Sequence, residues 1–557
     1  MSKRLLGWCA LCSIVYLWWA VPRLGLPLLT EEVQFAASWD RPLAKVVVGI
    51  PHPTAYIGLL RVLVNHGWLH GPFLRVVGMV SFGALIVLVA YLAERLSPGA
   101  GPLAALLWTV HPMAIQGSLI LEIDNALLTL VVTAYLALLM ALPVRLSRGQ
   151  VVGLGLALAG CLWVKLSCAP FLLLAAALRP WSQRQWALGG RQVLAIAGIA
   201  VVVFLGSWRF WCALSGISWV SVFDWVATAT HRGLQGEMFG WGTELLNRAG
   251  RVGLWLNPWL VVGWLVASWW VGRVPAAERW RWWSLVGFTA VVMIGYLIIR
   301  GTHFGFAKYH LPALPAALAL VAATAQRAIK PLVARQRIVL GLVGLLGLGY
   351  FWGVGDLLYQ VNYTLRLALL TGTPPLAAML RQLLGRSLLY LLPGFVVGGW
   401  LLGRWPRGQR AAGVCTGLLL LLLSSNLALD LRQRQAPYAT TYTYGRSWGT
   451  YQEAVQWVKA FRQAHPNAAI VGPVDILWSA GVLYTEWLSV SLPDSGETIL
   501  QAIQNPAVGC LLYGTTTHDL RTWRQLLATP QFRKELEQHF TEVTVHQGEY
   551  FAWVRRP

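Results

Sequence analysis

The sequence predicts a polytopic, all-α membrane protein of about thirteen transmembrane helices, followed by a C-terminal extracytoplasmic α/β domain. Three observations predict this fold class. The 557 residues are 57% hydrophobic and only 12% charged, which is more apolar than soluble domains of this length. Arginine-rich connectors recur between the apolar segments, and the composition turns polar after residue 429.

Apolar windows long enough to cross the hydrocarbon core occur about thirteen times before residue 430. Lys3 and Arg4 precede the first window, which has no small-residue cleavage site, so we expect a retained helix and not a removed signal peptide. The fifth and sixth windows are short and form either two spans or one hairpin that does not fully cross. We expect spans at residues 5–24, 73–93, 99–115, 119–142, 151–165, 168–178, 193–211, 254–271, 282–298, 309–324, 338–350, 388–402 and 411–429.

The net charge of +22 is explained by topology. Arginines collect in alternate short loops, which is the pattern of cytoplasmic loops in membrane proteins. We therefore expect a multi-pass protein of the cell (cytoplasmic) membrane with a cytoplasmic N-terminus, and we expect no nucleic-acid partner. The basic loops are residues 94–95, 145–148, 179–191, 273–281, 327–337 and 404–410.

The sequence divides into a membrane domain, residues 1–429, and an extracytoplasmic domain, residues 430–557. The membrane domain has three long outer loops, 27–71, 216–251 and 355–386, whose mixed aromatic and charged residues favour interfacial amphipathic helices. In the second domain, helical spacing covers residues 451–461. Strands are expected at residues 468–471, 510–513, 542–546 and 550–555, the last two joined as a hairpin across residues 547–548.

Carboxylates at the edge of the apolar segments are the first candidates for function. Glu31 and Glu32 follow the first span and Asp124 begins a later one, and an ionisable residue near the bilayer is costly to keep. Each has a plainer interpretation, because the glutamate pair also fits a solvated loop and Asp124 also fits the positive end of a helix dipole. For Glu237 and Glu244, in the second long outer loop, solvation is the favoured interpretation.

Basic residues and cysteines also have both a functional and a structural interpretation. Lys165 fits phosphate binding and snorkelling to the interface almost equally well. For Arg75, anchoring of a helix end is favoured over substrate contact. Histidines at span ends, such as His303 and His310, are usually interfacial residues whose hydrogen bonds are satisfied. Cys510, in the polar tail, is better interpreted as a small buried residue than as a reactive thiol. The seven cysteines show no spacing typical of disulfides or zinc sites.

The order of these residues resembles the GT-C superfamily of membrane glycosyltransferases, in the branch of protein O-mannosyltransferases and lipid A aminoarabinose transferases. Three blocks carry the resemblance. Glu31-Glu32 with Phe35-Ala36 and His52-Pro53 with Tyr56 lie at the family's first-loop motifs, with glutamate where the family has aspartate. Asp124 lies at its second acidic position, Lys165 at its lysine between short spans, and Lys308-Tyr309-His310-Leu311-Pro312 at its late basic motif.

The resemblance implies an inverting transfer of a sugar from a polyprenyl phosphate to an acceptor hydroxyl. A hydroxyl that attacks must lose its proton, so a carboxylate base is required, and Glu31 is the first candidate, with Asp124 beside it. The lipid phosphate gains charge as it leaves, which calls for nearby cations or donors. The substrate-binding candidates are Glu32, His52, Lys165, His303, Lys308 and Tyr309.

The implied partners are a polyprenyl-phosphate sugar donor, membrane lipids, and a protein, lipid or glycan acceptor. Metal-ligand spacing is missing from the sequence, so we expect no obligatory metal or other cofactor. Three alternatives stay open. A transporter or flippase is opposed by the lack of a visible repeat, an O-antigen ligase or polymerase by the acidic pair near the first span, and a catalytically inactive GT-C-like protein fits the glutamate at position 31.

Overall fold

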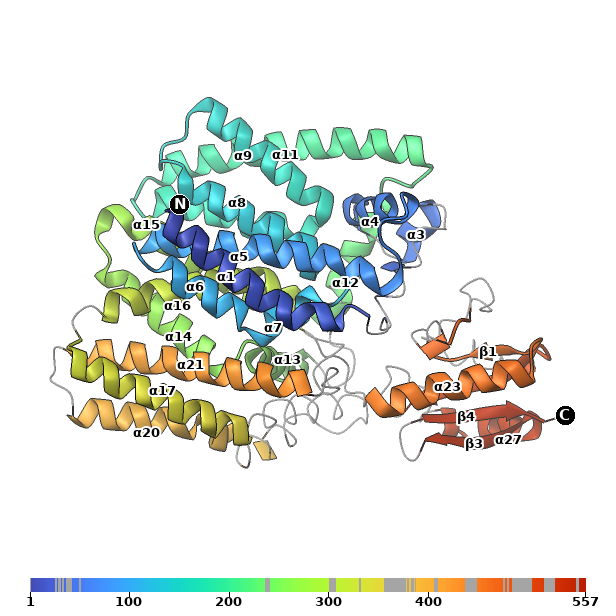
Figure 1. The fold of residues 1–557 in the computed structure, drawn as a ribbon. Helices are drawn as coiled ribbons and strands as arrows, with labels where there is room; N and C mark the ends of the chain where they lie inside the picture. The colour runs from blue at the N-terminus through green and yellow to red at the C-terminus, as the bar shows by residue number, and fades with distance from the viewer. Residues whose placement is uncertain are drawn as a thin grey trace.

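The computed structural model describes the greater part of the chain. It covers residues 2–25, 43–49, 52–235, 241–299, 307–329, 332–354, 388–404, 409–435, 448–473, 503–514, 526–546 and 550–556, together with single residues and short pieces between them. The first of these blocks form a helical bundle, and the last four form a small α/β domain (Figure 1).

The helical bundle begins with helices from the first third of the chain. These are α1 (Lys3–Ala20), η1 (Val21–Arg23), α3 (Leu43–Gly49), α4 (Ala55–Asn65), η3 (Gly71–Arg75), α5 (Val76–Leu96), α6 (Gly101–Thr109), α7 (Pro112–Ser118), η4 (Asp124–Leu128), α8 (Thr129–Ala141), α9 (Arg148–Val164), η5 (Leu166–Cys168) and α10 (Ala169–Trp181). The remaining helices of the bundle are α11 (Trp186–Ser215), α12 (Ser221–Gln235), α13 (Trp241–Trp255), α14 (Pro258–Trp270), η6 (Val271–Arg273), α15 (Ala276–Ile299), η7 (Lys308–Ala313), α16 (Leu314–Ile329), α17 (Ala334–Val354), α20 (Leu388–Arg404) and α21 (Arg410–Gln435).

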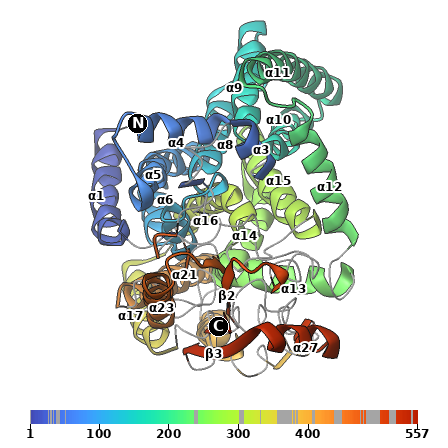
Figure 2. The ribbon, with the colours of Figure 1, turned by 90° about the vertical axis from the view of Figure 1, so that its right-hand side faces the viewer.

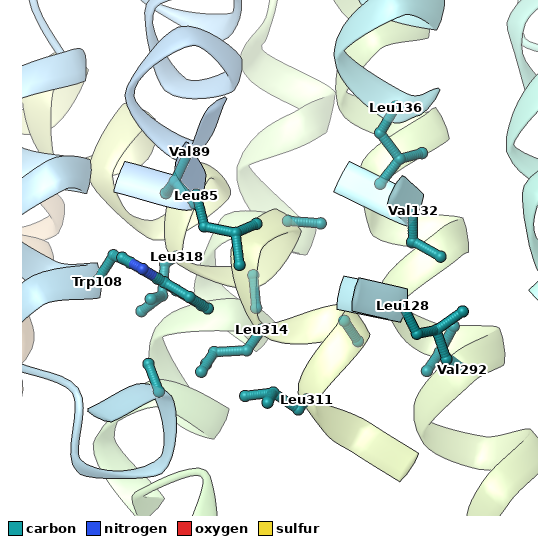
Figure 3. Packing of buried hydrophobic residues seen from close by; sticks show 14 of the residues in the cluster. Leu85, Val89, Trp108, Leu128, Val132, Leu136, Val292, Leu311, Leu314 and Leu318 are labelled. Carbon is teal, nitrogen blue, oxygen red and sulfur yellow. The ribbon is translucent and has the colours of Figure 1, made fainter. Parts of the chain in front are cut away.

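Helix α16 is the centre of the bundle. It packs against α5, α6, α14, α15 and α21, and nearly all of its side chains are buried. Leucines from α16 and from α5 meet Trp108 of α6, while η7, η4 and α15 close the same core on the other side (Figure 3). Seen end-on, the helices surround this core from all sides (Figure 2). The core therefore fixes η4 and η7, the two short elements that carry the candidate site residues.

The long apolar windows form helices as predicted, but the count of thirteen spans is not confirmed. Among the described residues, seven helices are long and apolar enough to cross a membrane, or eight if α13 and α14, bent by 93° at their junction, count as one span. The other expected windows contain shorter helices, such as the 13 residues of α8 and the 17 of α9. The chain is a multi-pass membrane protein.

Proline and polar residues explain two of the shortened spans. Pro112 divides the window at 99–115 into α6 and α7, because the residue before a proline disfavours helical backbone. The His111 ring then caps the new helix by accepting the Met113 N–H at 3.2 Å. In the window at 119–142, the regular α-helix begins only at Thr129, after the segment that contains Glu122 and Asp124.

Helices are present in two of the three segments that we expected to be long outer loops. The first loop contains α3 and α4, and the second contains α12 and α13. In α4 and α13 the buried residues recur at helical spacing, so one side of each helix packs against the rest of the protein. The third expected loop, 355–386, lies almost entirely outside the described residues.

The C-terminal α/β domain has α23 (Trp448–Ala464), β1 (Ala469–Val471), β2 (Val508–Gly514), α27 (Pro530–His539), β3 (Phe540–His546) and β4 (Tyr550–Arg555). The strand order is β1-β2-β4-β3, with β1 and β2 parallel and the other pairs antiparallel. All four expected strands are found, and β3 and β4 pair as the predicted hairpin. Cys510 is fully buried in β2, as the sequence indicated, and burial raises the pKa of its thiol.

Candidate active site

A cluster of buried charges lies where η4, η7 and the junction of α9 with η5 meet. Four side chains form its centre: Glu122, Asp124, Lys165 and Lys308. The residues Glu122, Asp124 and Lys165 are each less than 5% exposed. Buried charges in a membrane protein are kept at a free-energy cost, so a cluster of this kind indicates a functional site.

The position of Asp124 comes from an unusual helical turn. Asp124–Leu128 forms a π-helical turn, in which the Leu128 N–H donates to the Ile123 carbonyl at 3.0 Å. The wide turn is supported by Thr129, whose hydroxyl donates to the Asp124 carbonyl at 2.8 Å. Single π turns inside helical segments are common at functional sites.

Asp124 and Lys165 form a buried ion pair. Lys165 ends α9 in extended backbone, and its ammonium donates to the two carboxylate oxygens of Asp124 at 2.5 and 2.6 Å. The side chains are 1% and 5% exposed, respectively. Because both oxygens already bind one ammonium, this carboxylate is better suited to orienting groups than to removing a proton.

Lys165 and Lys308 both lie over the aromatic ring of Tyr309. Their Nζ atoms are 4.6 and 5.3 Å from the ring centroid, within the range of cation–π attraction. Tyr309 also stacks on Tyr296 of α15, with ring centroids 5.4 Å apart. The Tyr296 hydroxyl is 2.6 Å from that of Ser167, so the basic motif is held against both α15 and η5.

Glu32 has a different environment from Asp124. Arg75 donates to its two oxygens at 2.9 and 2.8 Å, and the Leu121 N–H donates to one of them at 2.7 Å. Both side chains of the ion pair are 1% exposed. Glu32 therefore joins the first outer loop to η3 and to the chain just before η4. The sequence did not indicate that Arg75 pairs with Glu32.

His52 and Tyr56 extend the cluster from the first outer loop. His52 packs edge-on against Trp225 of α12, at 5.1 Å between ring centroids, and it lies within electrostatic reach of Asp124. Tyr56 is fully buried. Burial first, and then the carboxylates of Glu122 and Glu32, raise the pKa of Tyr56 well above its ordinary value. The tyrosine therefore keeps its hydroxyl proton at neutral pH.

The expectation that Glu244 is solvated is wrong. It is 4% exposed and accepts a hydrogen bond at 2.8 Å from Arg248, one turn along α13. Arg248 in turn donates to the carbonyl of Ile298 at 3.1 Å, at the end of α15. Arg251, three residues further on, is fully buried. The spacing of these three charged residues places them on one face of α13, which was the signal for burial that the sequence offered.

The structure brings together Asp124, Lys165, Lys308 and Tyr309, and it places Glu32 and His52 beside them. Two predicted site residues, Glu31 and His303, lie outside the described residues, and Glu237 lies outside them too. Within the part of the chain that the structure describes, no group of three or more histidine, cysteine, aspartate or glutamate side chains could hold a metal ion. The roles assigned to individual residues remain predictions.

Comparison with known proteins gives matches only among solved structures. No family model and no curated protein matches the chain. Two crystal structures of ArnT from Cupriavidus metallidurans are similar to it: one bound to undecaprenyl phosphate (15% identity, 98% of each chain covered, TM-score 0.46) and one in the apo state (15% identity, 98% of each chain covered, TM-score 0.48). Both neighbours are structures of the same protein, and the similarity extends over nearly the whole of each chain.

Proposed function

We propose that this protein is an inverting glycosyltransferase that moves a sugar from a polyprenyl-phosphate donor to a hydroxyl acceptor on the outer face of the cytoplasmic membrane. The single observation that carries the proposal is a pair of lysines over the ring of Tyr309, of which Lys165 is buried and Lys308 is partly exposed. The carboxylates of Asp124 and Glu122 balance their charge. Such a site can receive a lipid phosphate whose charge grows during the reaction.

Lys308 is our candidate for contact with the departing phosphate. Its side chain is 14% exposed, while that of Lys165 is 5% exposed, so it is the more accessible of the two ammonium groups. Lys165 holds both oxygens of Asp124 and acts through that residue. We propose His52 as a further contact for the donor, and His303 stays a candidate from the sequence.

Glu31 is our candidate for the general base. In the described part of the chain, four buried carboxylates are each held by a cation: Glu32 by Arg75, Glu122 by Lys308, Asp124 by Lys165, and Glu244 by Arg248. Carboxylates bound in this way position groups and do not readily take a proton from a hydroxyl. Glu31 directly precedes the anchored Glu32 in the chain, and we assign it to proton removal.

The proposal includes the finer topology. We propose thirteen spans with the shorter helices counted among them, a cytoplasmic N-terminus, and an extracytoplasmic domain formed by residues 430–557. A periplasmic reporter fused after residue 557 should be active. A reporter that is active there only in the cytoplasm would contradict the odd number of spans.

The test of function is release of lipid phosphate from a radiolabelled polyprenyl-phosphate sugar by the purified full-length protein. We expect turnover by the wild-type protein and its loss in Glu31→Gln, Asp124→Asn and Lys308→Met. Arg327→Met is the matched control, because Arg327 pairs with Glu278 at 2.6 Å near the other end of the helix that follows Lys308. It should retain activity.

Two results would contradict the proposal. If the wild-type protein releases no lipid phosphate with any of several sugars and acceptors, but moves a lipid-linked sugar across liposome membranes, it is a flippase. If Glu31→Gln and Asp124→Asn both turn over like the wild-type protein, the assignment of the site is wrong.

A further inference from the structure

Glu122 uses its two carboxylate oxygens for two different contacts. Oε2 accepts the backbone N–H of Asp124 at 2.8 Å, and Oε1 accepts a hydrogen bond from the Lys308 ammonium at 3.2 Å. The side chain is 4% exposed. One oxygen therefore fixes the backbone where the π turn begins, and the other reaches the basic motif 186 residues further along the chain.

These contacts close a ring of interactions. Asp124 forms an ion pair with Lys165, and both Lys165 and Lys308 lie over the aromatic ring of Tyr309. Lys308 also forms an ion pair with Glu122, which precedes Asp124 by two residues. The ring joins three segments that are distant in sequence. Glu122 contacts both the backbone of Asp124 and the ammonium of Lys308, so it sets the positions of Asp124 and Lys308 relative to each other.

Resting on the proposed function, we propose that Glu122 is a positioning residue of the transfer reaction: it holds Asp124 through one oxygen and Lys308 through the other. It does not itself touch the reacting atoms. Through Asp124 it keeps the acidic turn in place for the acceptor side of the reaction. Through Lys308 it keeps one ammonium facing the donor phosphate and away from Asp124, which already binds Lys165.

The two contacts can be separated by substitution. In Glu122→Gln, the amide oxygen can still accept the Asp124 N–H, but the charged partner of Lys308 is lost. In Glu122→Leu both contacts are lost, while a side chain of similar length fills the space. The conservative variant therefore tests the Lys308 contact alone, and the apolar variant tests the pair.

We expect Glu122→Gln to raise KM for the polyprenyl-phosphate sugar roughly 10-fold with a smaller change in kcat, since a hydrogen bond to a charged group is lost. Glu122→Leu should in addition lower kcat by roughly 10- to 100-fold, because Asp124 is no longer held and small misplacements are costly in rate. The matched control is Glu278→Gln, which breaks an ion pair with Arg327. Glu278 lies in the first turn of α15, whereas Tyr296, which contacts the site, lies near the end of that helix. The control variant should leave both constants near those of the wild-type protein.

A double-mutant cycle with Lys308→Met decides whether Glu122 acts through Lys308. If it does, Glu122→Gln has no further effect on KM in the Lys308→Met background. Multiplicative effects of the two changes would overturn the proposal, and so would equal kinetic losses in Glu122→Gln and Glu122→Leu. Restored donor binding in Glu122→Asp, which can keep a charge near Lys308, would support it.

The same cycle read by thermal unfolding in detergent separates this inference from the proposed function. A coupling between Glu122 and Lys308 in unfolding temperature is expected whatever the substrate is. Coupling in stability without any transfer activity of the wild-type protein would mean that the proposed function has failed while the contact itself is real. Wild-type activity without coupling in KM would mean that the positioning role has failed.

Discussion

Removal of the Lys165 ammonium should destabilise the protein strongly. The change Lys165→Met keeps a long side chain but leaves the carboxylate of Asp124 buried at 1% exposure without the cation that binds both of its oxygens. Breaking a buried ion pair by removing one partner costs about 3–5 kcal/mol, because an uncompensated charge remains inside. We expect a loss of this size in the free energy of unfolding.

The companion variant carries Asp124→Asn together with Lys165→Met. It removes both charges, so the penalty for a lone buried carboxylate disappears, and most of the lost stability should return. The assay is denaturant-induced unfolding of the purified protein in detergent micelles, followed by tryptophan fluorescence. Because Asn keeps hydrogen-bonding groups in the site, we expect the recovery to be incomplete.

Arg327→Met provides the reference for an accessible pair. Arg327 and Glu278 are 20% and 43% exposed in their side chains, and pairs of this kind contribute about 0–1 kcal/mol. If Lys165→Met costs no more than Arg327→Met, or if the double change is as unstable as the single one, the reasoning about the buried pair is refuted.

Three further predictions follow from close contacts. Gly78→Ala should lower the free energy of unfolding by about 1–3 kcal/mol, because its new Cβ would lie 2.3 Å from the backbone oxygen of Ser118, whereas Gly83→Ala in the same helix meets nothing within 4 Å and should be neutral; equal melting temperatures would contradict this. Arg75→Lys should not preserve stability, since one ammonium cannot reproduce the two-point contact with Glu32; a wild-type unfolding curve would disprove it. All seven cysteines are buried, so a maleimide reagent should label the protein only after denaturation, and rapid labelling of the native protein would count against the described packing.

The C-terminal α/β domain was the part of the fold that sequence patterns predicted most closely. Alternating apolar residues predicted all four strands within two residues of their observed ends, and the last two strands pair antiparallel as the predicted hairpin requires. These signals are local, since alternation along a strand and turn-forming residues need no knowledge of distant contacts. The parallel pairing of β1 with β2 was not predicted, because the two strands are far apart in the sequence and neither strand's own residues indicate its partner.

The membrane domain was predicted in type but less well in detail. Hydropathy finds apolar windows, yet it does not show where a helix breaks inside one. Pro112 ended one helix and began another, and the acidic turn at Asp124 delayed the start of α8. Both effects depend on backbone hydrogen bonds, which an average over about twenty residues does not register.

The site was predicted as a set of residues but not as a set of contacts. The order of motifs singled out Asp124, Lys165 and Lys308, and the structure brings them together. Which cation binds which carboxylate could not be inferred, since the two central pairs join residues 41 and 186 positions apart. The contacts of Glu122 were missed for the same reason. The burial of Glu244 was missed because solvation was the favoured interpretation of a charged side chain in that loop.

A structure of the full-length protein with bound polyprenyl phosphate tests the central claim most directly. We expect the phosphate beside the cluster of charges, with an oxygen within hydrogen-bonding distance of the Lys308 ammonium, at about 2.7–3.2 Å. A phosphate bound elsewhere on the protein, with Lys308 and Tyr309 remote from it, would contradict the account.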